Sequence, residues 1–464
     1  WSMETLGTQG AQRYRTAWAK VVKATATGPR TVRFDFNTAD RELPLILGMR
    51  PILKKAQYQG VDFTASSQVA PVGSGPYVVA SHVPGRQIIF RRNPDWWGRD
   101  LPFNRGQHNF DEVRVEYFTD ASVVFEAFKA GEITVYREPN PAKWAVNYDF
   151  PAVSAGKVVL EEIPHRRPSG IEGLVFNSRR AAFADWRVRQ ALIHAFNFEL
   201  ANQTVSGGVL PRIRSYFGNS ELGADITAPA PADEAALLAP FAADLPPGTL
   251  TGYALPQGDG TEANRANIRK ARALLEEAGW TVQEGVLKNA AGQPFAFDIL
   301  LQQGNEDIAT AAKIFVESLK RLGITARITM VDAAQYKLRT NDYDFDMTHY
   351  IRALSLSPGN EQTLYWGARG ATEPGTRNWM GMNSPAADAM VETMLNARTA
   401  DEFRGGVLAL DRVLTAGAGV IPVWFNDRSR MARDARLRHP DRLPLYGDWT
   451  GFLPDVWWQE PDQP

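Results

Sequence analysis

The spacing of apolar residues predicts a chain in which strands and helices alternate. Val32, Phe34 and Phe36 alternate with polar residues, so we expect the second arm of a hairpin at 31–36. The first arm, around 17–24, fits either a strand or a helix. Short apolar runs predict further strands at 77–81, 88–91, 113–118, 172–177, 295–301, 324–330 and 419–425.

Helical spacing is clearest at 185–199, where residues such as Val188 and Leu192 share one face. Further helices are predicted at 122–130, 265–278, 308–322, 388–397 and 401–414. Three of them end at a glycine, and two of these are followed by a strand, an order typical of mixed α/β layers. The stretch 227–260 is rich in Pro, Ala, Gly and Asp, and we expect it to be a long surface excursion.

Length and composition narrow the class of protein. The 464 residues exceed the roughly 250–300 at which a single core stops growing, so two or three domains are expected. Lys and Arg (51) nearly balance Asp and Glu (52), which argues against nucleic acid as a partner. The absence of cysteine excludes disulfides, thiolate zinc sites and cysteine nucleophiles. No apolar run reaches the roughly 20 residues of a transmembrane helix.

Most motifs of enzyme and metal chemistry are missing from the sequence. There is no H-x-x-x-H pair, no phosphate or dinucleotide loop and no G-x-S-x-G elbow, so no metal and no cofactor is expected. The DYDFD run at 342–346 places alternate carboxylates on one side of an extended segment. It fits a glycosidase-like cluster or a calcium ligand run. The favoured interpretation is an exposed strand entry with Phe345 and Met347 facing the core.

The segment 350–362 is the strongest candidate for a ligand site. It follows a strand-like run, and loops at strand ends offer free backbone groups on a rigid base. Arg352 suits bidentate binding of a carboxylate, and suits an ordinary surface ion pair equally well. The candidate ligand-binding residues here are Tyr350, Arg352, Ser355, Ser357, Asn360 and Glu361. Trp366, Trp379 and Trp424 are added as rings that either line a pocket or belong to the core.

Three motifs occur in order along the chain. Residues 71–77 (PVGSGPY) match the pattern P-x-G-[ST]-G-P-Y, and residues 92–98 (RNPDWWG) match R-N-P-x-[YW]-W. Phe176-Asn177 and 183–192 (FADWRVRQAL) match N-x(n)-P-F-x-D-x-R-V-R-x-A-L, with Ala182 in place of the usual proline. Together they resemble the family-5 extracellular solute-binding proteins, the oligopeptide and dipeptide binders of ABC importers.

Four further segments carry a narrower resemblance, at 41–48, 212–222, 357–362 and 410–414. They are similar to the YejA-type branch, which is associated with peptides and microcin C uptake. The resemblance implies an α/β fold of the periplasmic-binding-protein type II kind. It has two lobes with mixed sheets, joined by a two-strand hinge, and the first lobe is discontinuous.

The resemblance also implies a division of the chain. Residues 1–60 are expected to end an extra subdomain, 61–165 to form the returning part of lobe one, 171–422 to form lobe two, and 428–464 to pack back on lobe one. The hinge strands are expected near 170–177 and 420–426. A signal peptide and much of the first lobe are expected to be missing before residue 1.

The implied function is capture of a peptide or peptide-like ligand in an interlobe cleft of a periplasmic monomer, which delivers it to the permease of an ABC importer. Such a binder needs no catalytic group. In these proteins an acidic side chain shortly after an aromatic commonly holds the ligand's ammonium group. Here no acid follows Tyr350 until Glu361. Therefore Glu361 serves, or the ligand lacks a free amine, or it presents an anionic group to Arg352.

Two alternatives remain open at this stage. The first is a binder of oligosaccharide or opine-like solutes that uses Trp366, Trp379 and Trp424 as stacking platforms. The second is a peptidoglycan or glycan hydrolase that uses carboxylates such as Asp344 and Asp346.

Overall fold

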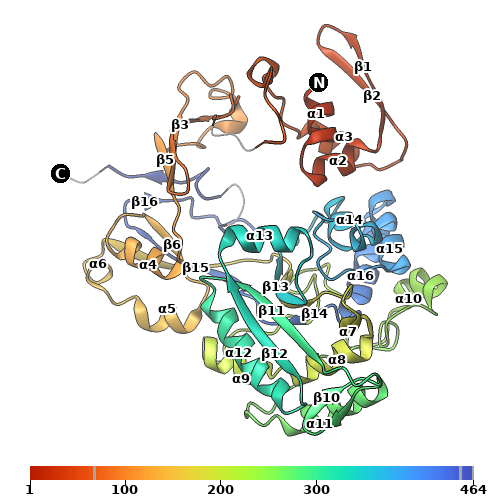
Figure 1. Ribbon diagram of the computed structural model, residues 1–464. Helices are drawn as coiled ribbons and strands as arrows, with labels where there is room; N and C mark the ends of the chain where they lie inside the picture. The colour runs from red at the N-terminus through yellow and green to blue at the C-terminus, as the bar shows by residue number, and fades with distance from the viewer. Residues whose placement is uncertain (66–68, 449–451, 462–464) are drawn as a thin grey trace. The chain divides into compact units, whose positions relative to one another are not determined.

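The computed structural model describes residues 1–65, 69–448 and 452–461 (Figure 1). Its internal contacts divide the chain into two compact units. Unit 1 comprises Trp1–Arg137, Asp149–Ile163 and Met431–Pro464, and unit 2 comprises Glu138–Tyr148 and Pro164–Arg430. The crossings expected near 170–177 and 420–426 therefore lie inside unit 2.

Unit 2 is built on a five-stranded sheet with the order β12-β11-β13-β8-β14 (Figure 1). The strands are β8 (Ile171–Phe176), β11 (Ala296–Gln302), β12 (Thr325–Val331), β13 (Met347–Arg352) and β14 (Val420–Pro422). Strand β11 runs parallel to β12 and β13, whereas β8 is antiparallel to β13 and β14. The register places Tyr350 opposite Gly173 and Val420 opposite Val175.

The two faces of this sheet belong to two separate hydrophobic cores. Because side chains alternate along a strand, Leu174 and Met347 enter one core while Val175 and Tyr350 enter the other. Both faces are covered, so β8 is a nearly continuous apolar run instead of an alternating one.

Helices cover both faces of the sheet. The first core receives side chains from α8 (Trp186–Ala195), α9 (Phe198–Ser206), α11 (Arg265–Glu277) and α12 (Glu306–Lys320). The second receives them from α10 (Ala232–Leu238), α14 (Glu361–Trp366), α15 (Pro385–Asn396) and α16 (Ala400–Ala416). The smaller elements of unit 2 are α5 (Pro141–Asn147), α7 (Ala181–Ala184), β9 (Thr281–Gln283), β10 (Val286–Lys288) and α13 (Ala333–Asn341).

Two expectations about unit 2 were wrong. The single helix expected at 185–199 is two helices, because Asn197 caps α9 by accepting a hydrogen bond from the Leu200 N–H at 3.2 Å. The excursion at 227–260 contains α10, which docks onto α16. A buried ion pair between Glu234 and Arg412 holds it there, and Leu238 is fully buried.

Unit 1 contains the hairpin that the sequence predicts, formed by β1 (Val21–Gly28) and β2 (Thr31–Phe36). Its helices are α1 (Ser2–Gln9), α2 (Gln12–Trp18), α3 (Leu43–Gly48), α4 (Ala121–Lys129) and α6 (Pro151–Ser154). Its other sheets are β3-β4-β5, β6-β15-β7 and β16-β17. Their strands are β3 (Tyr77–Val83), β4 (Gln87–Arg92), β5 (Glu112–Glu116), β6 (Val135–Arg137), β7 (Val158–Pro164), β15 (Arg428–Asp434), β16 (Leu437–Arg438) and β17 (Trp458–Gln459).

Helix α5 groups with unit 2, although it lies within the range 61–165 that was expected to form lobe one. Its capping residue Asn140 donates from Nδ2 to the Val205 carbonyl at 2.8 Å and to Asp307 at 3.0 Å. Lys143 adds an ion pair with Asp307 at 3.3 Å. These contacts tie α5 to α9 and α12.

Strand β8 approaches β14 so closely that only glycine fits at position 173. A Cβ atom on Gly173 would lie 1.9 Å from the Ile421 carbonyl oxygen. We expect Gly173→Ala to lower the free energy of unfolding by about 2 kcal/mol or more, because the backbone of one strand must move. Urea unfolding followed by circular dichroism measures this.

Gly405→Ala in α16 is the matched control for that substitution. Its Cβ would meet nothing nearer than Leu237 Cδ1 at 3.6 Å, so the change should stabilise the helix by about 0.5–1 kcal/mol. Equal unfolding midpoints for the two variants would show that the close approach of β8 and β14 does not restrict which residue fits at position 173.

Asp411 of α16 is a fully buried carboxylate that organises the chain after residue 214. It accepts hydrogen bonds from the Ser215 hydroxyl (2.5 Å), the Tyr216 N–H (2.8 Å) and the Ala224 N–H (3.0 Å). Burial raises the pKa of Asp411 to about 6, and these hydrogen bonds oppose that rise.

The raised pKa of Asp411 predicts a pH dependence of stability. Protonated Asp411 contributes to the free energy of unfolding, and this contribution is fully present below 3.8, the pKa of the carboxyl in the unfolded chain. The contribution is lost as the pH rises through about 6, the pKa in the folded chain. Between pH 4 and pH 7, the wild type should lose up to about 2–3 kcal/mol relative to Asp411→Asn, which cannot ionise. Denaturant unfolding at both pH values tests this, and parallel stability curves for the two proteins would contradict it.

Candidate functional site

The end of β13 places Tyr350 in the core and Arg352 one step further along the same face of the strand. Tyr350 has no exposed surface, and its hydroxyl donates to the Arg377 carbonyl at 3.1 Å. Burial raises the pKa of Tyr350 to about 12, and the neighbouring Arg352 charge opposes that rise. Tyr350 is therefore a neutral, fixed support for the arginine beyond it.

The guanidinium of Arg352 lies over three aromatic rings. Its central carbon is 4.3 Å from the Tyr350 ring centroid, 4.8 Å from that of Trp379 and 5.7 Å from that of Tyr365. Nη1 donates to the Ile351 carbonyl at 2.6 Å, but Nε and Nη2 are buried and have no hydrogen-bond partner among the described residues. Such an arginine has two donors available for an anionic group, and buried polar atoms ordinarily have a partner.

Trp379 lies beside Arg352, and packing against other aromatic rings holds its ring in place. Its ring packs against those of Tyr336 (6.3 Å), Phe345 (6.0 Å) and Tyr350 (5.5 Å). The chain around it is fixed by Arg179, whose guanidinium donates to the carbonyls of Gly370, Ala371, Asn378 and Trp379 at 2.7–3.2 Å. Burial lowers the pKa of Arg179.

The predicted polar residues of the following loop form a local network. The Ser355 hydroxyl accepts from the Ser357 N–H at 3.2 Å, and Ser357 is exposed. Asn360 precedes α14 without capping it through its side chain. Glu361 Oε1 accepts from the Gly359 N–H at 3.0 Å and from Gln362 Nε2 at 3.1 Å. Glu361 thus stabilises the turn into α14, the helix that carries Tyr365 to Arg352.

Trp366 and Trp424 lie in the two cores and not beside Arg352. Trp366 is fully buried, and its Nε1 donates to Gln362 at 2.6 Å. Trp424 is 6% exposed and belongs to the core on the other face of the sheet. Neither ring has the exposed face that stacking requires, so the proposed site keeps only Trp379 of the three tryptophans.

Three contributors to the site were missed from the sequence: Tyr365, Arg377 and Arg179. Tyr365 and Arg179 act through contacts between distant segments, which no local spacing reveals. Arg377 could have been noticed in the sequence. One residue separates it from Trp379, and one residue likewise separates Tyr350 from Arg352, so both segments pair an aromatic residue with an arginine at the same spacing.

Two of the three carboxylates of the DYDFD run, Asp344 and Asp346, are engaged in ion pairs. Asp344 pairs with Arg339 at 2.9 Å, and Asp346 pairs with Arg180 at 3.1 Å. Phe345 and Met347 are buried, as expected of a strand entry. Over the residues with a described position, no group of three His, Asp or Glu side chains is arranged to hold a metal ion.

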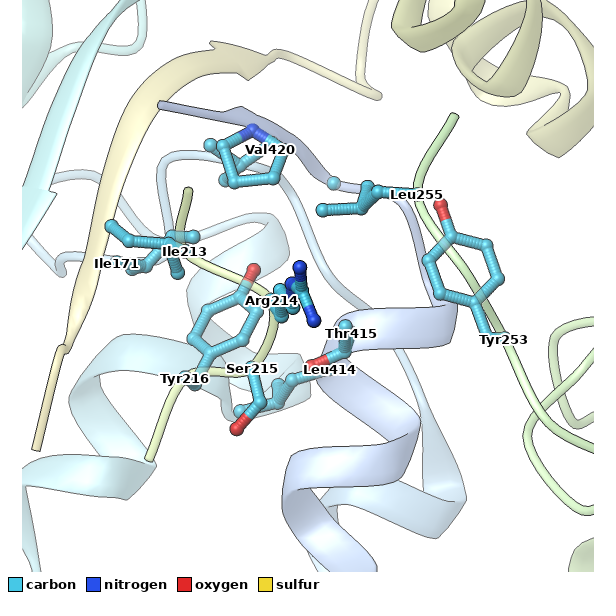
Figure 2. A pocket seen from close by; sticks show the side chains of 12 residues that line it. Ile171, Ile213, Arg214, Ser215, Tyr216, Tyr253, Leu255, Leu414, Thr415 and Val420 are labelled. Carbon is cyan, nitrogen blue, oxygen red and sulfur yellow. The ribbon is translucent and has the colours of Figure 1, made fainter. Parts of the chain in front are cut away.

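A small cavity of about 20 Å³ lies beside β8 and β14 (Figure 2). Ile171 and Val420 line it from the strands, Arg214 and Tyr216 from the loop, and Thr415 from α16. It has room for about one water molecule, which is too little for a peptide. The end of β13 therefore remains the candidate ligand site.

Every helix in the described parts of the chain is too short or too polar to span a bilayer.

Comparison with known proteins identifies the family of this chain. The family model of bacterial extracellular solute-binding proteins, family 5 (middle part), matches residues 1–374. A protein of Agrobacterium fabrum named "peptidoglycan-binding protein YepA" is 40% identical over 451 residues, which cover 94% of this chain and 72% of the relative. Another from that organism, named "probable peptide-binding protein YejA", is 36% identical over 455 residues, which cover 96% of this chain and 73% of the relative.

A solved structure shows the same fold. The oligopeptide-binding protein AppA of Bacillus subtilis, in complex with a nonapeptide, matches with a TM-score of 0.75 at 18% identity, covering 99% of this chain and 82% of that one. The α/β fold of the periplasmic-binding-protein type II kind and the YejA-type resemblance are thereby confirmed. The chain belongs to the bacterial extracellular solute-binding proteins of family 5.

Proposed function

We propose that this chain is the substrate-binding component of an ABC importer, and that it holds a peptide or peptide-like ligand at the end of β13. The observation that carries the proposal is Arg352, which lies among three aromatic rings with two buried donors unused in the described structure. The name of the relative YejA supports a peptide ligand, and that of the relative YepA supports a ligand derived from peptidoglycan.

The chemistry of the site favours a carboxylate on the ligand. A carboxylate accepts two parallel hydrogen bonds from a guanidinium, and the aromatic rings around Arg352 exclude water that would weaken them. Glu361 is already engaged by Gly359 and Gln362, so it is poorly placed to serve as an ammonium anchor. Of the three possibilities that the sequence left open, an anionic group bound to Arg352 is the one we adopt.

Two sources of such a ligand are chemically plausible. One is an ordinary short peptide with a free carboxyl terminus. The other is the peptide portion of peptidoglycan, which the name of the relative YepA favours. Stacking of an oligosaccharide has less support, because only Trp379 of the three candidate tryptophans lies at the site. Periplasmic location, a monomeric state and delivery to a permease are part of the proposal.

The direct test is to identify what the protein carries. Mass spectrometry of solutes released from the chain after mild purification should detect short peptides or peptidoglycan peptides. Recovery of oligosaccharides alone would overturn the proposed ligand class. Turnover of a labelled peptidoglycan substrate by the purified protein would overturn the non-catalytic role.

Arg352→Ala should weaken binding of a short peptide by about tenfold or more, since it removes charge-assisted hydrogen bonds at a partly buried site. Glu361→Ala should also weaken binding, through loss of the turn that positions α14. Isothermal titration calorimetry with trialanine and with a peptidoglycan stem peptide measures both effects.

Arg398→Ala, at an exposed position between α15 and α16, is the matched control and should leave affinity unchanged. Thermal unfolding of all three variants separates loss of binding from loss of folding. Unchanged affinity in both Arg352→Ala and Glu361→Ala would remove the end of β13 as the ligand site.

A further inference from the structure

A second arginine lies beside the same aromatic group as Arg352. The central guanidinium carbon of Arg377 is 6.0 Å from the Tyr365 ring centroid, and that of Arg352 is 5.7 Å from it. Neither arginine forms an ion pair with any carboxylate of the described residues. Two cations therefore share one aromatic ring without a compensating charge.

The backbone of Arg377 is fixed where it can serve this site. Its N–H donates to the Leu364 carbonyl in α14 at 3.0 Å, and its carbonyl accepts the Tyr350 hydroxyl at 3.1 Å. Arg377 is thus tied both to the helix that carries Tyr365 and to the strand that carries Arg352. Its side chain is exposed, so it can reach a bound molecule.

Acidic residues close in sequence do not neutralise the pair, since Glu373 pairs with Arg369 at 2.6 Å and Asp346 with Arg180 at 3.1 Å. Glu361 directs Oε1 to the Gly359 N–H and to Gln362, and it forms no ion pair with Arg352 or Arg377 within the described structure. The buried Arg412 of the same unit, by contrast, is paired with Glu234. Two like charges left beside one ring repel each other, and a ligand with negative charge relieves that cost.

We propose that the site selects ligands with two acidic groups, one bound by Arg352 and the other by Arg377. This inference rests on the proposed function and specifies its ligand class, a peptide-like compound with a second carboxylate besides its terminal one. An extended chain spans about 3.5 Å per residue, so carboxylates on the same or neighbouring residues can reach both arginines. Each arginine offers a planar fork that matches carboxylate geometry.

The test compares two tripeptides that differ in one charge, alanyl-alanyl-glutamate and alanyl-alanyl-glutamine. Isothermal titration calorimetry with the full 464-residue chain should give roughly tenfold tighter binding of the glutamate peptide. In Arg377→Gln this preference for the glutamate peptide should fall to about twofold or less. Arg398→Gln, which removes one exposed positive charge elsewhere in unit 2, should keep the full preference.

The outcomes separate this inference from the proposed function. If both tripeptides bind the wild type equally well, or if the preference survives in Arg377→Gln, the second acidic group has no role and only this inference fails. If Arg398→Gln also loses the preference for the glutamate peptide, that preference arises from long-range attraction between charges. It then does not arise from a contact with Arg377, and the inference again fails. If neither tripeptide binds any of the proteins, the proposed function fails together with it.

Discussion

The burial of Tyr350 determines where Arg352 of the candidate site lies. Tyr350 fills the second core of unit 2 from β13, and its hydroxyl is tied to the backbone of Arg377. Because side chains on one face of a strand are two residues apart, Arg352 must emerge where that core ends. The aromatic rings around the guanidinium are themselves the edge of the core. The site is therefore an extension of the packing that stabilises the sheet.

The charged groups of unit 2 fall into two classes. Arg179 binds four backbone carbonyls, Arg412 pairs with Glu234, and Asp411 accepts several hydrogen bonds. These groups have their hydrogen-bond partners within the fold. Arg352 and Arg377 lack such partners in the described structure. That contrast is the reason for choosing the end of β13 as the candidate site.

Much of the architecture was predictable from sequence because it depends on local spacing. The hairpin arm at 31–36 follows from the alternation of apolar residues, and the DYDFD run was recognised as the entry to a strand. Tyr350 and Arg352 were placed after that strand, whereas both belong to β13. The break at Asn197 was missed because a cap interrupts an otherwise continuous apolar face. Trp366 and Trp379 looked equivalent in sequence. Only contacts between distant segments decide that the first lies inside the core and the second beside Arg352.

Arg179 holds its loop entirely through backbone carbonyls. Every residue type has a carbonyl, so the Arg179 contacts do not depend on the side chains of the stretch 371–378, although other contacts constrain Gly375, Thr376 and Asn378. That stretch includes Arg377. A substitution of the exposed Arg377 therefore leaves in place the Arg179 contacts that anchor Trp379.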